Sequence, residues 1–99
     1  MTKETIKTEC GLTAVNYFLA DHTKSWETVV DFKTQEIDVD LLHIINIPHY
    51  VLAIWNKTEC KFQEATIIDG TEAEAIEEFE TVCNRFKTEP TNWGWKGKA

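Results

Sequence analysis

Two segments of the chain carry apolar residues at helical spacing. Residues 11–21 predict a helix that buries one side. Its apolar positions are Leu12, Val15 and Leu19. A second helix is predicted after Gly70, where Thr71 and Glu74 have the spacing of a capping box. The apolar positions of this second helix are Ala73, Ile76, Phe79 and Val82 or Cys83.

The middle of the chain has the patterns of β-strands. Residues 50–68 contain two alternating runs separated by the polar residues 56–59, which predicts a hairpin. Residues 26–32 also alternate and predict a strand, with a short helix capped by Ser25 as the alternative. Residues 38–47 are rich in β-branched and leucine side chains and stop at a proline. They form either a strand or a buried helical turn.

No repeat, low-complexity tract or linker interrupts the 99 residues, of which 42% are hydrophobic. A chain of this size and apolar content is expected to make one small domain around a single core. We therefore predict one domain over residues 1–99, of the α+β class. Its N-terminal helix packs on a small antiparallel sheet, and its second helix follows the sheet at the C-terminal end.

The composition argues against two classes of partner. Asp and Glu outnumber Lys and Arg by 17 to 10, and the resulting charge of −7 opposes binding to nucleic acid through basic grooves. No apolar run approaches the ~20 residues that span a bilayer, and residues 1–7 lack the apolar segment of a signal peptide. Three cysteines, an odd number, fit reduced thiols in a reducing compartment. We expect a cytoplasmic protein that contacts neither nucleic acid nor a membrane.

The candidate chemistry lies in one cysteine, one histidine and one aspartate. Cys10 stands at the predicted start of the first helix, where exposed amide groups and the helix dipole favour a thiolate. His49 opens the predicted hairpin, and Asp69 closes it. A histidine that takes the proton of a thiol yields a strong nucleophile, and a carboxylate orients the imidazole. These roles follow the chain order Cys, His, Asp.

Four short segments resemble the papain-like cysteine peptidases that process bacteriocin leaders, and their wider relatives. They are Cys-Gly-Leu-Thr-Ala from residue 10, His-Tyr-Val-Leu from residue 49, Ile-Ile-Asp-Gly ending at residue 70, and Ile-Glu-Glu-Phe-Glu from residue 76. The resemblance implies a papain-like core in which Cys10 is the nucleophile, His49 the general base and Asp69 the orienting carboxylate. It implies a peptidase or isopeptidase that cleaves a peptide or protein substrate through a thioester, without cofactor or metal.

The sequence departs from this family at two places. The family usually has a glutamine several residues before the cysteine, whose amide donates to the oxyanion, whereas that place is near Glu4 here. Lys7 and Asn16 are the residues that could substitute for it. The stretch between Cys10 and His49 is also shorter than the family usually has, which trims the expected substrate groove.

Two other interpretations use different residues. In the first, the chain is a non-enzymatic inhibitor or immunity protein of a mobile element, which blocks a basic partner through its acidic second helix and its tryptophan tail. The residues that would carry this contact are Glu77, Glu78, Glu80 and Trp93. In the second, a zinc ion is held by Cys10, Cys60, His43 and His49, but no pair among them has the close spacing of structural zinc ligands. Cys60 and Cys83 are otherwise expected to be structural.

Overall fold

The computed structural model describes residues 1–21, 25–45 and 49–88. The chain forms five strands and two helices in this part. In chain order they are β1 (Thr2–Ile6), α1 (Glu9–Asp21), β2 (Trp26–Lys33), β3 (Ile37–Ile44), β4 (His49–Asn56), β5 (Lys61–Asp69) and α2 (Glu72–Thr88). Neither described helix has the length and apolarity needed to cross a membrane.

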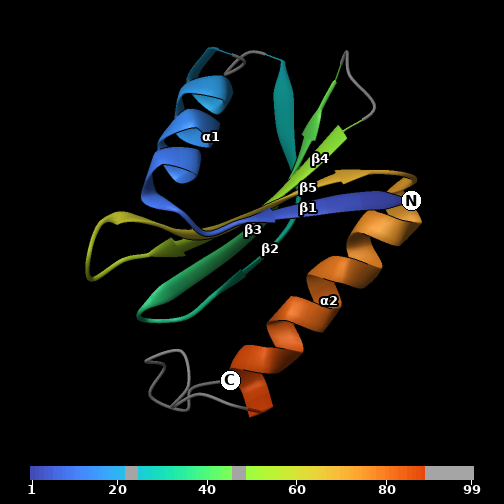
Figure 1. Cartoon of the computed structure of the whole chain (residues 1–99). Coiled ribbons are helices and arrows are strands. Elements are labelled where there is room, and N and C mark those ends of the chain that lie inside the picture. The colour runs from blue at the N-terminus through green and yellow to red at the C-terminus, as the bar shows by residue number, and fades with distance from the viewer. Residues whose placement is uncertain (22–24, 46–48, 89–99) are drawn as a thin grey trace.

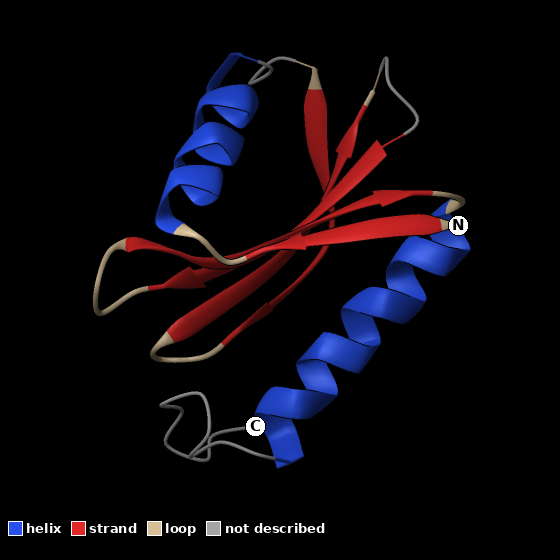
Figure 2. Ribbon diagram, in the orientation of Figure 1, coloured by secondary structure: helices blue, strands red, loops and turns tan. Residues whose placement is uncertain are grey.

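All five strands pair in one antiparallel sheet with the order β1-β5-β4-β3-β2. Consecutive strands from β2 to β5 are neighbours, while β1 lies beside β5, the last strand of the chain. The two helices cover opposite faces of this sheet (Figures 1 and 2). We call these the α1 face and the α2 face. Among the described strands, β1 and β2 lie at the two edges of the sheet.

Alternation along the strands supplies an apolar cluster to each face. The cluster under α1 contains Leu12, Val15, Leu19, Leu42, Ile44, Val51, Ala53 and Ala65. The cluster under α2 contains Ile37, Val39, Leu41, Tyr50, Leu52, Ile54, Ile68, Ala75, Phe79, Val82, Cys83 and Phe86. Because both faces of β4 are covered, five successive residues from Tyr50 to Ile54 are buried.

The α+β class, both helices and the hairpin are confirmed. Residues 26–33 and 37–44 are strands, so neither the short helix at Ser25 nor the buried helical turn is formed. The capping box is also present: the amide of Glu74 donates to Thr71 Oγ1 at 3.2 Å, and the amide of Thr71 donates to Glu74 Oε1 at 2.9 Å. The strand β1 was not predicted from the sequence, because its residues have no alternating apolar positions.

Candidate functional site

Thr8 directly precedes α1, so Cys10 lies in the first turn of the helix. The amide of Gly11 donates to Thr8 Oγ1 at 3.1 Å, and the amide of Leu12 donates to the Thr8 carbonyl at 2.9 Å. Thr8 therefore caps the helix. Cys10 is exposed, whereas the buried positions of α1 are Leu12, Val15 and Leu19. The thiol thus lies away from the stripe that packs on the sheet.

His49 and Asp69 meet at the open end of the predicted hairpin. They are paired across β4 and β5, and both lie on the α1 face. The distance from His49 Nδ1 to Asp69 Oδ1 is 3.9 Å, too long for a hydrogen bond. Nδ1 is buried and has no hydrogen-bond partner among the described residues. The fold therefore brings the predicted base close to the predicted carboxylate.

The fold does not bring Cys10 to this pair. Ile6 is paired with Ala65, which is paired with Ala53 in β4, four positions beyond His49. Strand geometry then separates the Cα atoms of Ile6 and His49 by about 13 Å along the strands and about 10 Å across them, hence by about 16 Å overall. The first turn of α1 rests on Ile6, since a Cβ built on Gly11 would lie 2.6 Å from Ile6 Cγ2.

Figure 1 shows the same arrangement: α1 begins beside the end of β1, while β4 begins at the opposite end of the sheet. A general base must reach its proton within hydrogen-bond distance or through one water. The geometry consequently assembles two members of the predicted triad and leaves the nucleophile apart from them.

The residues considered for the oxyanion are also placed by the fold. Lys7 Nζ lies 3.7 Å from Oε1 of Glu64, a buried carboxylate whose other oxygen lies 3.7 Å from Arg85. Asn16 lines a groove between α1 and the β4–β5 turn, together with Trp55 and Phe62. Glu4 lines a second groove, on the other side of α1, which contains His49.

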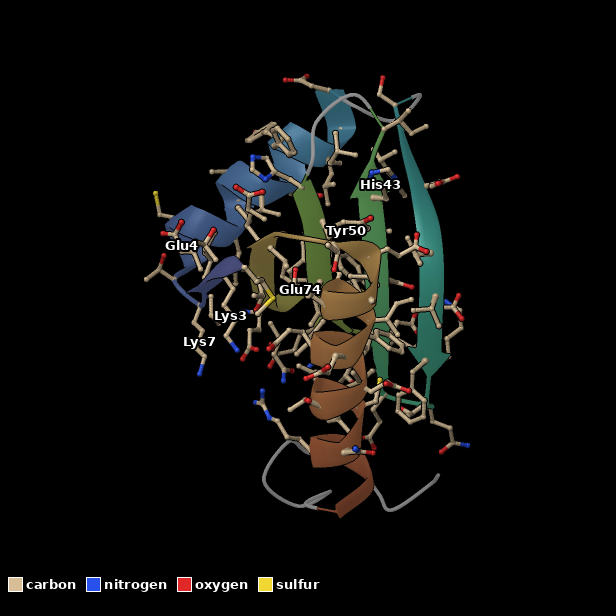
Figure 3. All side chains as sticks on the ribbon, turned by 90° about the vertical axis from the view of Figure 1, so that its right-hand side faces the viewer. Lys3, Glu4, Lys7, His43, Tyr50 and Glu74 are labelled. Atoms are coloured by element: carbon tan, nitrogen blue, oxygen red, sulfur yellow. The ribbon has the colours of Figure 1, made fainter. Side chains whose placement is uncertain are left out.

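The remaining sulfur and imidazole groups have separate surroundings. Cys83 is buried in the α2-face cluster, as expected of a structural residue, but Cys60 is exposed in the β4–β5 turn with a φ of 54°. His43 stacks on Tyr50 with a centroid distance of 4.7 Å, and Figure 3 shows the two rings side by side. Over the described ranges no group of three or more histidine, cysteine or acidic residues could hold a metal ion.

Three aspartates gather on the α1 face near the β2–β3 turn. Asp31 is directly paired with Asp40, and Asp38 lies two positions from Asp40 on the same face. Lys33 approaches Asp31 at 3.9 Å and Asp38 at 3.8 Å, and Lys57 approaches Asp38 at 3.2 Å. Burial raises the pKa of Asp40 above its usual 3.8; Lys33 opposes this shift, and Asp38 and Asp31 add to it.

Our sequence reasoning missed these aspartates, although a signal was present. In residues 37–41 an apolar residue alternates with each aspartate, which places both aspartates of this run on one face of a strand. Their proximity to Asp31 required the register of β2 and β3.

The raised pKa of Asp40 gives a testable pH dependence. A carboxyl group whose pKa is higher in the folded state destabilises the fold when it ionises. For Asp40 this loss of stability is absent below pH 3.8 and complete above the folded-state pKa. We expect Asp40→Asn to stabilise the protein at pH 7 by a few tenths to about 1 kcal/mol, the range for like charges facing each other in a sheet, and to give no gain at pH 3. Thermal unfolding at both pH values measures this. If Asp40→Asn lowered the stability at pH 7, the attraction between Lys33 and the Asp40 carboxylate would outweigh the cost of burying that carboxylate.

Comparison with protein-family models, with curated proteins and with solved structures found no match to this chain. The papain-like family stated above therefore remains a resemblance carried by short segments. The function is inferred from the geometry and charge of the described residues.

Proposed function

We propose that this chain is a non-enzymatic binding protein that engages a basic protein partner. One observation carries the proposal: every lysine or arginine side chain that the structure describes lies 2.8–3.8 Å from a carboxylate of the chain itself. These residues are Lys3, Lys7, Lys33, Lys57, Lys61 and Arg85. Each of these cations already contacts a carboxylate of the chain itself. The carboxylates that remain therefore leave an excess of negative charge at the surface.

The outer side of α2 is the acidic surface that the sequence indicated, with one change. Glu77 and Glu80 are exposed, and no ion pair found in the described part of the chain includes either of them. Glu78 instead pairs with Lys3 at 2.8 Å and ties α2 to β1. Trp93 lies outside the described residues. The partner surface on α2 is therefore assigned to Glu77 and Glu80.

The hydrolase interpretation has less support from the geometry. It requires the Cys10 thiol to transfer its proton to His49, and the register separates their neighbourhoods by about 16 Å. Binding to a basic surface requires no contact between these residues. It depends on complementary charge, which acts mainly on the rate of encounter.

Charge reversal separates the two functions. We expect Glu77→Lys with Glu80→Lys to slow association with the partner about tenfold at low salt, with a smaller effect at 300 mM salt because exposed charges are screened. Cys10→Ser should leave association unchanged. The partner is first captured on the immobilised chain from an extract of the source cells and identified by mass spectrometry. Its association rate is then measured with purified proteins by surface plasmon resonance.

The matched control reverses Glu4 and Glu9, two exposed residues of β1 and α1. This variant changes the net charge by the same amount at a different surface, so it should retain most of the association rate. Cleavage of the partner during the assay, abolished by Cys10→Ser while association is kept, would refute the binding proposal and support the hydrolase.

A further inference from the structure

The edge strand β2 is the open side of the sheet. The faces are covered by α1 and α2, so among the described strands the backbone groups that do not pair within the sheet lie along β1 and β2. β2 has eight residues and β1 has five. In Figure 3, β2 lies at the outer margin of the molecule, away from α1. An eight-residue edge is long enough to accept an added strand.

The register shows which groups of β2 point outward. The amide of Thr34 donates to the Ile37 carbonyl at 2.8 Å, which makes these residues a hydrogen-bonded pair. Hydrogen-bonded and non-hydrogen-bonded pairs alternate along an antiparallel ladder. Asp31 and Lys33 therefore occupy non-hydrogen-bonded positions opposite β3, and their N–H and C=O groups face the open edge.

The side chains of this half of β2 form a charged face, with Asp31 and Lys33, and an apolar face. On the α1 face, Asp31 is opposite Asp40 in a non-hydrogen-bonded pair, the kind in which Cα atoms approach to about 4.5 Å. On the other face, Val30 and Phe32 are only partly buried and pack against the α2-face cluster. A strand added here would meet Asp31 and Lys33 on one face and apolar side chains on the other.

We propose that β2 is a docking edge for an extended segment of a protein partner in which basic and apolar residues alternate. Asp31, Asp38 and Asp40 outnumber Lys33 and Lys57, the two lysines that contact this group. The basic residues would balance the remaining negative charge, and the apolar residues would pack beside Val30. This inference rests on the proposed function, because it assigns the basic partner a strand as its means of attachment. Main-chain hydrogen bonds supply affinity in such complexes, and alternate side chains supply specificity.

The charges favour a foreign segment over a second copy of this chain. Two copies paired through β2 would bring Glu27 and Asp31 of each strand to the same interface, and each copy carries a net charge of −7. The register shift between Thr28 and Val30 also interrupts the edge, a device that opposes pairing between identical edges.

The test uses a capped synthetic peptide, Thr-Lys-Val-Lys-Val-Lys-Thr, with the full chain labelled with ¹⁵N. We expect saturating peptide to slow hydrogen exchange at the amides of Asp31 and Lys33 at least tenfold and to leave the amides of β1 unchanged. A peptide of the same composition with its lysines and valines in separate blocks should bind at least tenfold more weakly. Binding of both peptides with equal affinity, or protection confined to other elements, would overturn the proposal.

Three variants of Asp31 separate the contribution of its charge from that of its backbone N–H group. Asp31→Lys should weaken peptide binding at least tenfold by placing like charge against the lysines, while Asp31→Asn should weaken it less and reduce its dependence on salt. Asp31→Pro should abolish binding without removing a bond to β3, since its N–H points outward. If Asp31→Pro does not fold, the first two variants decide the question: equal affinity for wild type, Asp31→Asn and Asp31→Lys would refute docking at β2.

The outcomes also separate this inference from the proposed function. Partner association that depends on Glu77 and Glu80, with no peptide binding at β2, would keep the function and reject the docking edge. Peptide pairing with β2 together with partner association that is unaffected by reversal of Glu77 and Glu80 would support the edge and reject the α2 surface.

Discussion

Phe86→Ala should lower the free energy of unfolding by about 3–5 kcal/mol, the usual cost of deleting a buried phenyl ring. Phe86 lies in one of the last turns of α2, is only 1% exposed and belongs to the α2-face cluster. A domain of this size commonly has about 5–15 kcal/mol of stability in total, so one substitution would remove a large share of it. Urea denaturation followed by circular dichroism measures the change in midpoint, with the slope expected to remain constant.

Glu80→Ala is the matched control on the same helix. Glu80 is exposed, and an exposed substitution away from caps and networks usually changes stability by less than about 0.5 kcal/mol. A loss below about 1 kcal/mol for Phe86→Ala would contradict the packing of this end of α2 on the sheet. The control also serves the binding experiments, because it shows that the acidic side of α2 can be altered while the fold is kept.

Gly11→Ala should destabilise the protein by about 1–2 kcal/mol, although alanine is the better helix former by about 1 kcal/mol. A Cβ at residue 11 would lie 2.6 Å from Ile6 Cγ2 and 2.9 Å from Thr8 Oγ1. Overpacking of this kind usually costs about 1–3 kcal/mol, and displacement of the Thr8 cap costs roughly another 0.5–2 kcal/mol. The steric terms together exceed the gain in propensity. Thermal unfolding at pH 7 measures the balance.

A double-mutant cycle with Ile6→Ala tests this cause. Truncating Ile6 removes Cγ2 but leaves the contact with Thr8 Oγ1. Gly11→Ala should therefore cost less in that background, with a coupling energy of about 1 kcal/mol or more. Stabilisation by Gly11→Ala in the wild-type background would show that α1 can move away from β1. The glycine after Cys10, which supported the resemblance to a peptidase, has a packing role here that does not involve the thiol.

The parts of the fold that could be predicted are those with a local pattern. Both helices have apolar residues at helical spacing, and the hairpin has alternating runs around a polar turn, so their existence followed from the sequence. β1 could not be predicted, because the run from Thr2 to Ile6 is mostly polar and exposed. Its position depends on pairing with β5 and on contacts such as the Lys3–Glu78 ion pair, which join residues far apart in the chain.

The same omission explains the outcome at the candidate site. His49 and Asp69 open and close one hairpin, so their proximity is a local property that the sequence could indicate. The place of Cys10 depends on β1, which delivers the chain to α1 at the edge of the sheet, two strands away from β4. A prediction that lacked β1 had no means of finding that separation.

The placement of β1 beside β5 has a consequence for the order of events during synthesis. Strands β2 to β5 join neighbours along the chain through short turns, so they can pair as soon as each successor emerges. The first strand must instead wait for the last one, because pairing Ile6 with Ala65 in β5 closes a loop of 58 residues. Such distant pairing is slow compared with local hairpin formation. Until it occurs, β5 is itself an unprotected edge, and α1 has no anchored starting point.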